Sequence, residues 1–341
     1  MLTERQILVL VVIIDEFIQT AQPIGSRAIA KKAEITFSPA TIRNEMADLE
    51  ELGYIEKTHT SSGRVPSEKG YRFYVDHLMS PFRLSKQDML TIQQTFQKEM
   101  IEFELLVQKS ARVLSDITNY TSIILGPEVF ETTLKQIQII SLSDHTAVAI
   151  LVTSTGHVEH RHFNVPPTMQ TSDLEKLINI LNDRLVGVPI VQLQQKLYGE
   201  VSQLLQRYSS DFQTTYSFLK DALLDKQPVK LYMDGKTNIM LQPEFNDIHK
   251  IQSLYTVMEK EDKMANILRT SGKGIKVSIG QENELDEMQD CSLITATYTL
   301  GGEKQLGTIA LLGPTRMEYS KVVTLLNILS QRLTDTFHSW R

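Results

Sequence analysis

The strongest constraint on the fold lies in the first 80 residues, where several helix starts lie close together. Thr3 predicts a capping box with Gln6 at the start of a first helix. Ser26 is placed to cap a short second helix. Ser38 followed by Pro39 predicts the start of a third, because serine accepts a hydrogen bond from a free amide and proline has no amide to leave unpaired. This spacing favours a small module of short helices.

A two-stranded hairpin is predicted directly after the third helix. Residues 54–57 have strand character, residues 58–63 are polar, and residues 64–66 return as a second strand. Ser67 then caps a further helix. Three helices followed by a hairpin with a polar tip is the element order of a winged helix-turn-helix. We therefore predict that fold for residues 1–80.

The exposed face of the third helix can be read from its 3.6-residue period. Three apolar residues share one side, which is predicted to face the core: Ile42, Met46 and Leu49. The residues near the helix start that lie away from this side are Ala40, Thr41, Arg43 and Asn44. Arginine pairs well with guanine, asparagine with adenine, and small side chains allow close approach, so this face is predicted to read DNA bases.

The predicted DNA-binding set adds the helix cap and the hairpin tip to this face. A serine cap and the free amides at a helix start are placed to meet a phosphate, and the tip is predicted to supply phosphate or minor-groove contacts. The full set is Ser38, Ala40, Thr41, Arg43, Asn44, His59, Thr60 and Arg64. The other end of the helix carries Asp48, Glu50 and Glu51 and is predicted to tilt away from DNA.

Charge limits the size of this surface. The chain has 35 Lys and Arg against 41 Asp and Glu, a net charge of −6, which excludes a generally basic nucleic-acid coat protein. Residues 1–80 hold nine basic and eleven acidic side chains, a net of −2, whereas residues 54–73 hold four and two, a net of +2. A small basic patch at the hairpin is therefore predicted. Composition leaves a second use open, since winged helices also serve as protein-interaction modules.

A break and a long helical pattern follow the first segment. Ser80-Pro81 disfavours helix and predicts a linker. Apolar residues at three- and four-residue spacing then predict one long amphipathic helix from about Ser85 to Ile117. Two interpretations remain open for it, namely ordinary packing within a domain and a coiled coil or lever that serves a dimer.

Strands are predicted in two blocks separated by roughly a hundred mostly helical residues. The predicted strands cover residues 136–142, 147–153, 158–165, 275–279, 293–300 and 306–311. The predicted helices cover residues 172–186, 197–207, 211–224, 246–269 and 318–337. Asp234-Gly235 predicts the turn of a hairpin within residues 230–241. This order predicts an α+β multidomain chain, in which one domain is interrupted by an inserted module.

Several chemistries are predicted to be absent. The single cysteine, Cys291, excludes an intrachain disulfide and a cysteine zinc motif, and is interpreted as a small buried residue. Of His157, His160 and His162, only the last two share a strand face, so no metal is predicted. Residues 272–274 are too short for a phosphate loop. Without an acid–base or nucleophile motif we predict no enzyme and no cofactor.

Nothing in the sequence predicts a membrane partner. The apolar run from Ile7 to Ile14 is far too short to span a bilayer, and no cleavage site of small residues follows it. A buried helix is the better interpretation. With one cysteine and no export signal, the chain is expected to be cytoplasmic.

Longer motifs carry a resemblance to a known family. They are residues 23–26, 38–46, 60–66, 234–235, 242–245, 279–280 and 313–319. Together they strongly resemble the HrcA family of heat-inducible repressors, in order and over essentially the whole chain. The resemblance implies a winged helix in residues 1–80 and a GAF-like domain in two halves, 85–168 and 270–341. It also implies an inserted dimerisation module in residues 169–269.

The same resemblance implies a function. It implies a homodimer that represses chaperone operons by binding double-stranded DNA at an inverted-repeat operator. It implies modulation by the chaperonin GroEL, which promotes the DNA-binding form, so that heat stress relieves repression. A palindromic operator independently calls for a two-fold protein. The alternative is a ligand-sensing transcriptional regulator whose GAF-like domain holds a small molecule.

Overall fold

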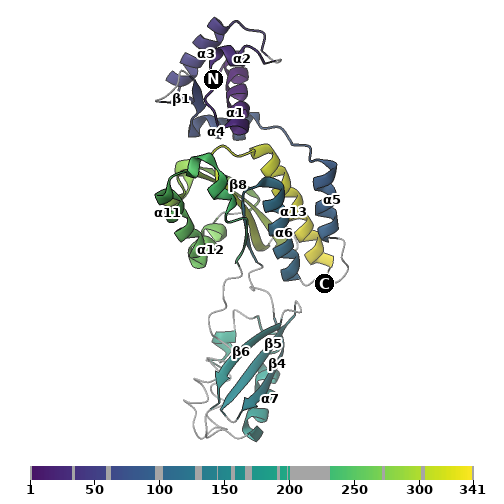
Figure 1. Cartoon of the computed structure of the whole chain (residues 1–341). Coiled ribbons are helices and arrows are strands. Elements are labelled where there is room, and N and C mark those ends of the chain that lie inside the picture. The colour runs from purple at the N-terminus through teal and green to yellow at the C-terminus, as the bar shows by residue number, and fades with distance from the viewer. Residues whose placement is uncertain are drawn as a thin grey trace. The chain divides into compact units, whose positions relative to one another are not determined.

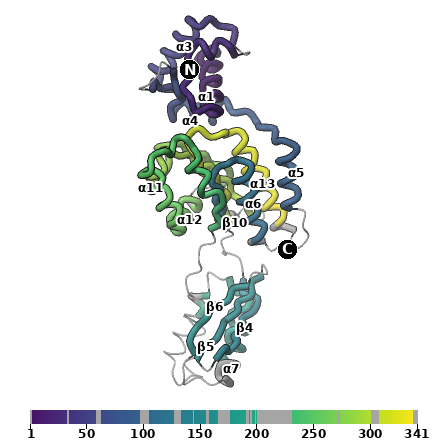
Figure 2. Tube along the Cα trace, viewed as in Figure 1, coloured from purple at the N-terminus to yellow at the C-terminus, as the bar shows by residue number. Residues whose placement is uncertain are grey.

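The computed structural model of the chain resolves into two compact units, residues 1–126 with 229–341, and residues 127–228. The described residues are 2–32, 35–58, 63–96, 103–126, 133–143, 145–154, 158–165, 171–189, 193–197, 199, 231–270, 273–300 and 304–339. Figures 1 and 2 trace these elements along the chain. Each unit has buried apolar residues of its own.

The N-terminal segment of the first unit has the predicted order of three helices and an antiparallel hairpin. Its elements are α1 (Glu4–Thr20), α2 (Ser26–Ile29), α3 (Pro39–Glu51), β1 (Ile55–Lys57), β2 (Arg64–Pro66) and α4 (Glu68–Phe73). In the hairpin, Ile55 pairs with Pro66 and Lys57 with Arg64. A π-helical turn, Tyr74–Leu78, continues α4.

Local capping sets these helix starts. Thr3 forms both hydrogen bonds of the capping box with Gln6, at 2.9 and 3.2 Å. Ser38 Oγ accepts from the Thr41 amide at 3.1 Å, and Ser67 Oγ accepts from the Gly70 amide at 3.0 Å. These three predicted caps are confirmed. The cap predicted at Ser26 is off by one residue, since α2 begins at Ser26 itself with Gly25 at the cap.

The core of this segment lies between α1 and α3. Leu10 and Ile13 of α1 and Ile42 and Leu49 of α3 are completely buried in one apolar cluster. Each such side chain contributes roughly 1.5–3 kcal/mol when it is removed from water. The predicted inner side of α3 is thereby confirmed, and its opposite side is left at the surface.

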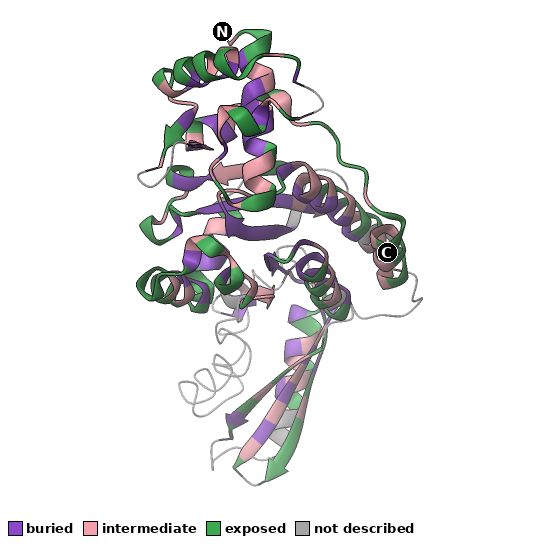
Figure 3. Cartoon of the chain, turned by 45° about the horizontal axis from the view of Figure 1, so that its top comes forward, coloured by how far each residue is buried: buried purple, intermediate pink, exposed green. Residues whose placement is uncertain are grey.

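A five-stranded antiparallel sheet with helices on both faces forms the rest of the first unit. Its strand order is β7 (Leu231–Asp234), β3 (Thr121–Leu125), β10 (Lys304–Pro314), β9 (Cys291–Leu300) and β8 (Ile275–Ile279). Helices α6 (Phe103–Thr118) and α13 (Tyr319–Ser339) belong to the cluster on one face, and α11 (Ile248–Glu259) and α12 (Glu261–Thr270) to that on the other. Figure 3 shows the burial of this sheet by residue: β3 is buried throughout, whereas the edge strand β7 is half-buried and β8 is exposed at its start.

The second unit is a three-stranded meander covered by a helix on one face. It comprises β4 (Leu134–Ser143), β5 (Thr146–Thr153), β6 (Val158–Asn164), α7 (Thr171–Leu185) and the short α8 (Leu193–Lys196). Asn182 of α7 accepts from the Ile137 amide at 2.8 Å and donates to the Ile137 carbonyl at 2.9 Å, which fixes the helix on β4. The helices predicted over 197–207 and 211–224 fall almost entirely outside the described residues.

The predicted long helix from Ser85 to Ile117 is wrong. The structure has two helices there, α5 (Lys86–Phe96) and α6, which lie side by side in Figures 1 and 2. Ile92 of α5 and Leu106 of α6 join the same apolar cluster. The 3-4 pattern is therefore shared by two helices that pack on one core. Residues 97–102 lie outside the described residues.

Two further predictions between the strand blocks are wrong. Gly235 does turn the chain, with φ of +67°, but β7 pairs with β3 instead of forming a hairpin within residues 230–241. After the turn, a 3-10 helix, Asn238–Leu241, begins. The side-chain amide of Asn238 donates to Ser115 Oγ at 3.0 Å. The helix predicted over 246–269 is split into α11 and α12 at Lys260, whose ψ is 81°.

The contact boundaries differ from the predicted GAF-like halves, 85–168 and 270–341, and from the predicted insertion, 169–269. The second unit begins at 127 rather than 169 and ends at 228 rather than 269, which is 42 and 41 residues earlier. The prediction joined both strand blocks in one domain. In the described chain, β4, β5 and β6 form a sheet of their own, and β3, which the sequence reading missed, completes the larger sheet with β7.

Candidate nucleic-acid interface

The start of α3 presents the predicted reading face, which we define as Ala40, Thr41, Arg43 and Asn44. Ala40, Arg43 and Asn44 are exposed and Thr41 is half-buried, whereas Ile42 between them is fully buried. Within the part of the chain that the structure describes, the side chain of Arg43 forms no ion pair or hydrogen bond. The 3.6-residue period thus brings the four residues together on one accessible helix face.

The cap of α3 forms hydrogen bonds within the first turn of the helix and leaves this end of the helix accessible. Ser38 Oγ accepts from the Thr41 amide at 3.1 Å and lies 2.9 Å from Thr41 Oγ1. Both side chains therefore serve the helix itself, and Ser38 remains exposed. A helix start carries partial positive charge and attracts anions within its first turn. This end of α3 can accept a phosphate.

Arg64, which is predicted to contact DNA from the hairpin, forms an ion pair within the N-terminal segment. Its guanidinium donates from Nε to Glu50 Oε2 at 2.8 Å and pairs through Nη2 with the same oxygen at 2.6 Å. The Arg64 side chain is only 17% exposed and that of Glu50 34%. The ion pair fixes the base of the hairpin to the C-terminal half of α3. Any phosphate contact by Arg64 has to compete with Glu50.

The hairpin is also anchored to the turn between α1 and α2. Ile24 and Arg64 exchange backbone hydrogen bonds of 3.1 and 2.9 Å. A Cβ at Gly63 would lie 2.8 Å from the carbonyl carbon of Pro23, so only glycine fits there. This contact explains why a glycine follows the polar tip. His59 and Thr60, both in the predicted set, lie outside the described residues.

Two lysines of the basic patch predicted in residues 54–73, Lys57 and Lys69, were not included in the predicted DNA-binding set. Lys57 is exposed on β1, next to the tip. Lys69 lies 4.6 Å from the ring centre of Tyr54 and donates to the Leu52 carbonyl at 2.8 Å, so it caps the C-terminal end of α3. Lys57 is therefore a candidate phosphate contact, whereas Lys69 stabilises the end of α3. Their positions relative to α3 depend on the hairpin register, which no local pattern shows.

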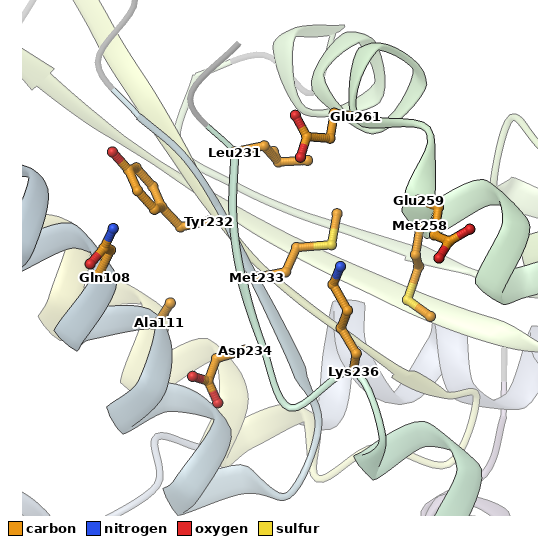
Figure 4. A pocket seen from close by; sticks show the side chains of 10 residues that line it. All are labelled: Gln108, Ala111, Leu231, Tyr232, Met233, Asp234, Lys236, Met258, Glu259 and Glu261. Carbon is orange, nitrogen blue, oxygen red and sulfur yellow. The ribbon is translucent and has the colours of Figure 1, made fainter. Parts of the chain in front are cut away.

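A groove at the edge of the five-stranded sheet is a second candidate site. It has a volume of about 670 Å³ and surrounds the edge strand β7. In Figure 4, Met233 and Lys236 point toward Met258 on one side of the strand, and Tyr232 lies toward Gln108 on the other. The groove is open, and its lining mixes apolar and charged side chains.

The histidines give no sign of a metal centre. His160 and His162 lie on β6 with ring centres 6.1 Å apart, and His157 is outside the described residues. Across the described ranges, no group of three or more His, Cys, Asp and Glu side chains is arranged to hold a metal ion. Burial raises the pKa of the Cys291 thiol to about 12, an effect that Asp290 reinforces, so this thiol stays protonated. Within the described residues, no helix has the length and hydropathy to cross a membrane.

Comparisons with known proteins agree on one family. The family model described as "HrcA protein C terminal domain" matches residues 104–323. The heat-inducible transcription repressor HrcA of Oceanobacillus iheyensis is 58% identical over 340 residues, which cover 100% of this chain and 98% of that protein. A hypothetical protein solved at 2.2 Å resolution shares the fold, with a TM-score of 0.65 and 23% identity over 100% of both chains.

The fold and these matches define the chain as a transcription repressor, a class of protein that acts on DNA. It belongs to the HrcA family of heat-inducible transcription repressors. The resemblance carried by the motifs of the sequence is confirmed.

Proposed function

We propose that residues 1–80 form a winged helix-turn-helix and that two copies of the chain bind an inverted-repeat operator in double-stranded DNA. The observation that carries this proposal is the reading face of α3, which is exposed beside an anion-accepting helix start. The proposed contacts are Ser38, Ala40, Thr41, Arg43, Asn44, His59, Thr60 and Arg64. Lys57 joins them, and Arg64 does so in competition with Glu50.

The rest of the chain is proposed to set up and regulate this binding. The five-stranded sheet and its helices serve as the GAF-like domain, and the second unit serves as the dimerisation module. The regulated genes are chaperone operons, and GroEL promotes the DNA-binding form, so that heat stress relieves repression. A repressor works where the chromosome lies, and a cytoplasmic location is therefore part of the proposal. Membership of the HrcA family supports each of these points.

A footprinting experiment on DNA upstream of chaperone operons tests the proposal. Two protected half-sites related by a two-fold axis, about 10 base pairs or a multiple of that apart, are expected from one dimer on one face of the duplex. Shift assays at several salt concentrations then measure the number of phosphate contacts from the slope of log K against log salt. Protection of a single asymmetric site, or no protection, would contradict the proposal.

A second candidate function is ligand sensing by the GAF-like domain. The groove around β7 favours it, because this groove has the volume of a small-molecule site and places Lys236, Glu259 and Glu261 within one lining. Native mass spectrometry of the purified chain, followed by calorimetry with any ligand found, tests this function. A ligand that alters operator affinity would establish sensing, and a chain that carries no ligand and binds the operator fully would reject it.

A further inference from the structure

The N-terminal segment is fixed to the sheet of the first unit by a set of directional contacts, which we call the joint. The joint comprises Arg72 and Glu68 of α4 on one side, and Gly280, Glu282 and Arg316 on the other. Three motifs that resemble the HrcA family outside the N-terminal segment meet here: residues 242–245, 279–280 and 313–319. The DNA contacts proposed above give none of them a role.

Arg316 is the centre of one half of the joint. It lies between β10 and α13 and is only 11% exposed. Its Nε donates to Glu244, and its Nη2 donates to Gln242 Oε1 at 3.0 Å. Its Nη1 donates to the Ile18 carbonyl of α1 at 3.0 Å. Because α1 has no basic residue in its own last turn, Arg316 supplies the cation that the C-terminal end of this helix favours.

The other half of the joint lies along α4. Arg72 donates from Nε to Glu282 Oε1 at 2.8 Å and from Nη2 to the Val277 carbonyl at 2.8 Å. The Glu68 carboxylate accepts from the Gln281 amide at 3.3 Å. A Cβ at Gly280 would lie 1.9 Å from Glu68 Oε1, which shows how closely α4 approaches this turn. The segment is thus attached at two separate places, and its rotation on the sheet is restricted.

Helix α1 transmits this restriction to α3. The end of α1 contacts Arg316 through the Ile18 carbonyl, and its start contacts α3 through the side chain of Gln6, whose Nε2 donates to Asp48 Oδ2 at 3.4 Å. With 17 residues, α1 is roughly 25 Å long at about 1.5 Å per residue. A rotation of about 10° at the joint therefore moves α3 by roughly 4 Å, which is about one base-pair step.

We propose that Arg316 and the Arg72–Glu282 pair are positioning residues for operator binding, which fix the angle of α3 and thereby the half-site spacing that two copies accept. This inference rests on the proposed inverted-repeat function. The joint residues touch no DNA in this scheme. They act through the orientation of the N-terminal segment, so their loss changes the choice between operator spacings and leaves the contacts within a half-site intact.

Operator binding by full-length Arg316→Gln tests the inference. The probes are the footprinted operator, the same duplex with two base pairs inserted between its half-sites, and a single half-site. Wild type is expected to prefer the native spacing at least about tenfold, and the variant less than about threefold, with half-site affinity unchanged within about twofold. Arg112→Gln is the matched control, because Arg112 is 75% exposed on α6 and pairs only loosely with Asp116, at 3.8 Å. A wild-type spacing preference in Arg316→Gln overturns the inference, as does an equal loss on all three duplexes.

A distance measurement keeps the test independent of DNA. Because the single native cysteine, Cys291, is buried, cysteines introduced at exposed Ala47 of α3 and Asp116 of α6 take spin labels selectively. Double electron–electron resonance between the two labels is expected to give one narrow distance distribution in wild type. In Arg316→Gln and in Arg72→Gln the distribution is expected to be broadened or shifted. Identical narrow distributions would overturn the inference. If wild type does not bind the operator but the two variants show broadened distance distributions, only the operator proposal is rejected.

Discussion

Two polar surfaces of the first unit, the reading face and the joint, use arginine in opposite ways. On the reading face of α3, Arg43 is exposed and keeps its donors available. At the joint, Arg72 and Arg316 direct theirs to carboxylates and backbone carbonyls. Arg64 at the hairpin is intermediate, since it lies near the candidate DNA surface but is paired with Glu50. An arginine close to a predicted interface is therefore not necessarily a ligand for DNA, and the availability of its donors decides between the two uses.

The largest effect is expected for Arg43→Ala, which removes the available arginine from the reading face. A bidentate contact to guanine is worth about 1–3 kcal/mol, so two copies lose roughly 2–6 kcal/mol of discrimination between operator and scrambled DNA. Fluorescence anisotropy on both duplexes measures the ratio. Arg112→Ala serves as the control on an exposed arginine remote in sequence. An unchanged ratio in Arg43→Ala would remove the reading face from the proposed interface.

The next effect concerns the glycine that allows the joint to close. Gly280 has φ of +56°, so Gly280→Ala costs about 1–2 kcal/mol of backbone strain and roughly 1 kcal/mol more for the displaced Glu68 contact. Gly274→Ala is the matched control, with φ of +84° and open space around the new Cβ. Urea unfolding measures the free energy of unfolding of both variants. Because both carry backbone strain and only Gly280→Ala displaces Glu68, the difference between the two losses gives the contribution of the Glu68 contact. Equal destabilisation would mean that the approach of Glu68 contributes nothing.

A smaller effect tests the intermediate case, Arg64. The Glu50–Arg64 pair is partly exposed and worth about 0–1 kcal/mol, so Glu50→Gln should raise affinity for any DNA by up to about fivefold. Arg64→Ala should lower the salt slope by about 0.9 for each lost phosphate contact. In the double variant the gain from Glu50→Gln should disappear. A gain that persists without Arg64 would mean that Glu50 simply repels DNA.

The smallest effect is a pH dependence of the joint. Burial opposes ionisation of Glu282, but hydrogen bonds from Arg72 and the Ile279 amide outweigh it and hold the pKa of this carboxyl below its usual value of 4.5. A lowered folded-state pKa stabilises the fold above the unfolded value, and this contribution is lost as the pH falls through the folded-state pKa. The difference in urea midpoint between wild type and Glu282→Gln should therefore be constant above pH 4.5 and shrink below it. A difference that grows on acidification would reverse the assigned sign.

The same contrast explains which features the sequence could predict. The reading face follows from helical period and from the cap at Ser38, both of which are local in sequence. The Arg64–Glu50 pair spans 14 residues and the Arg316–Ile18 contact spans 298, so no local pattern indicates either. Strand β3 was missed because a run of five residues with only three apolar ones, between Tyr120 and Gly126, does not distinguish a buried strand from a helix end. Without β3 the two strand blocks could not be assigned to separate sheets.

The position of β3 in the sheet has a consequence for how the chain is made. Every residue of β3 is buried between β7 and β10, yet Ser122 pairs with Asp234 and Thr121 with Leu312, which are 112 and 191 residues further along. At about 5–20 residues per second on the ribosome, both edges of this apolar strand stay open for roughly 5–20 seconds before the first partner is synthesised. The nascent chain therefore exposes an incompletely paired apolar strand until β10, which ends at Pro314, has been synthesised. The yield of finished repressor should then follow the supply of chaperone, which gives the proposed dependence on GroEL a physical origin in strand order.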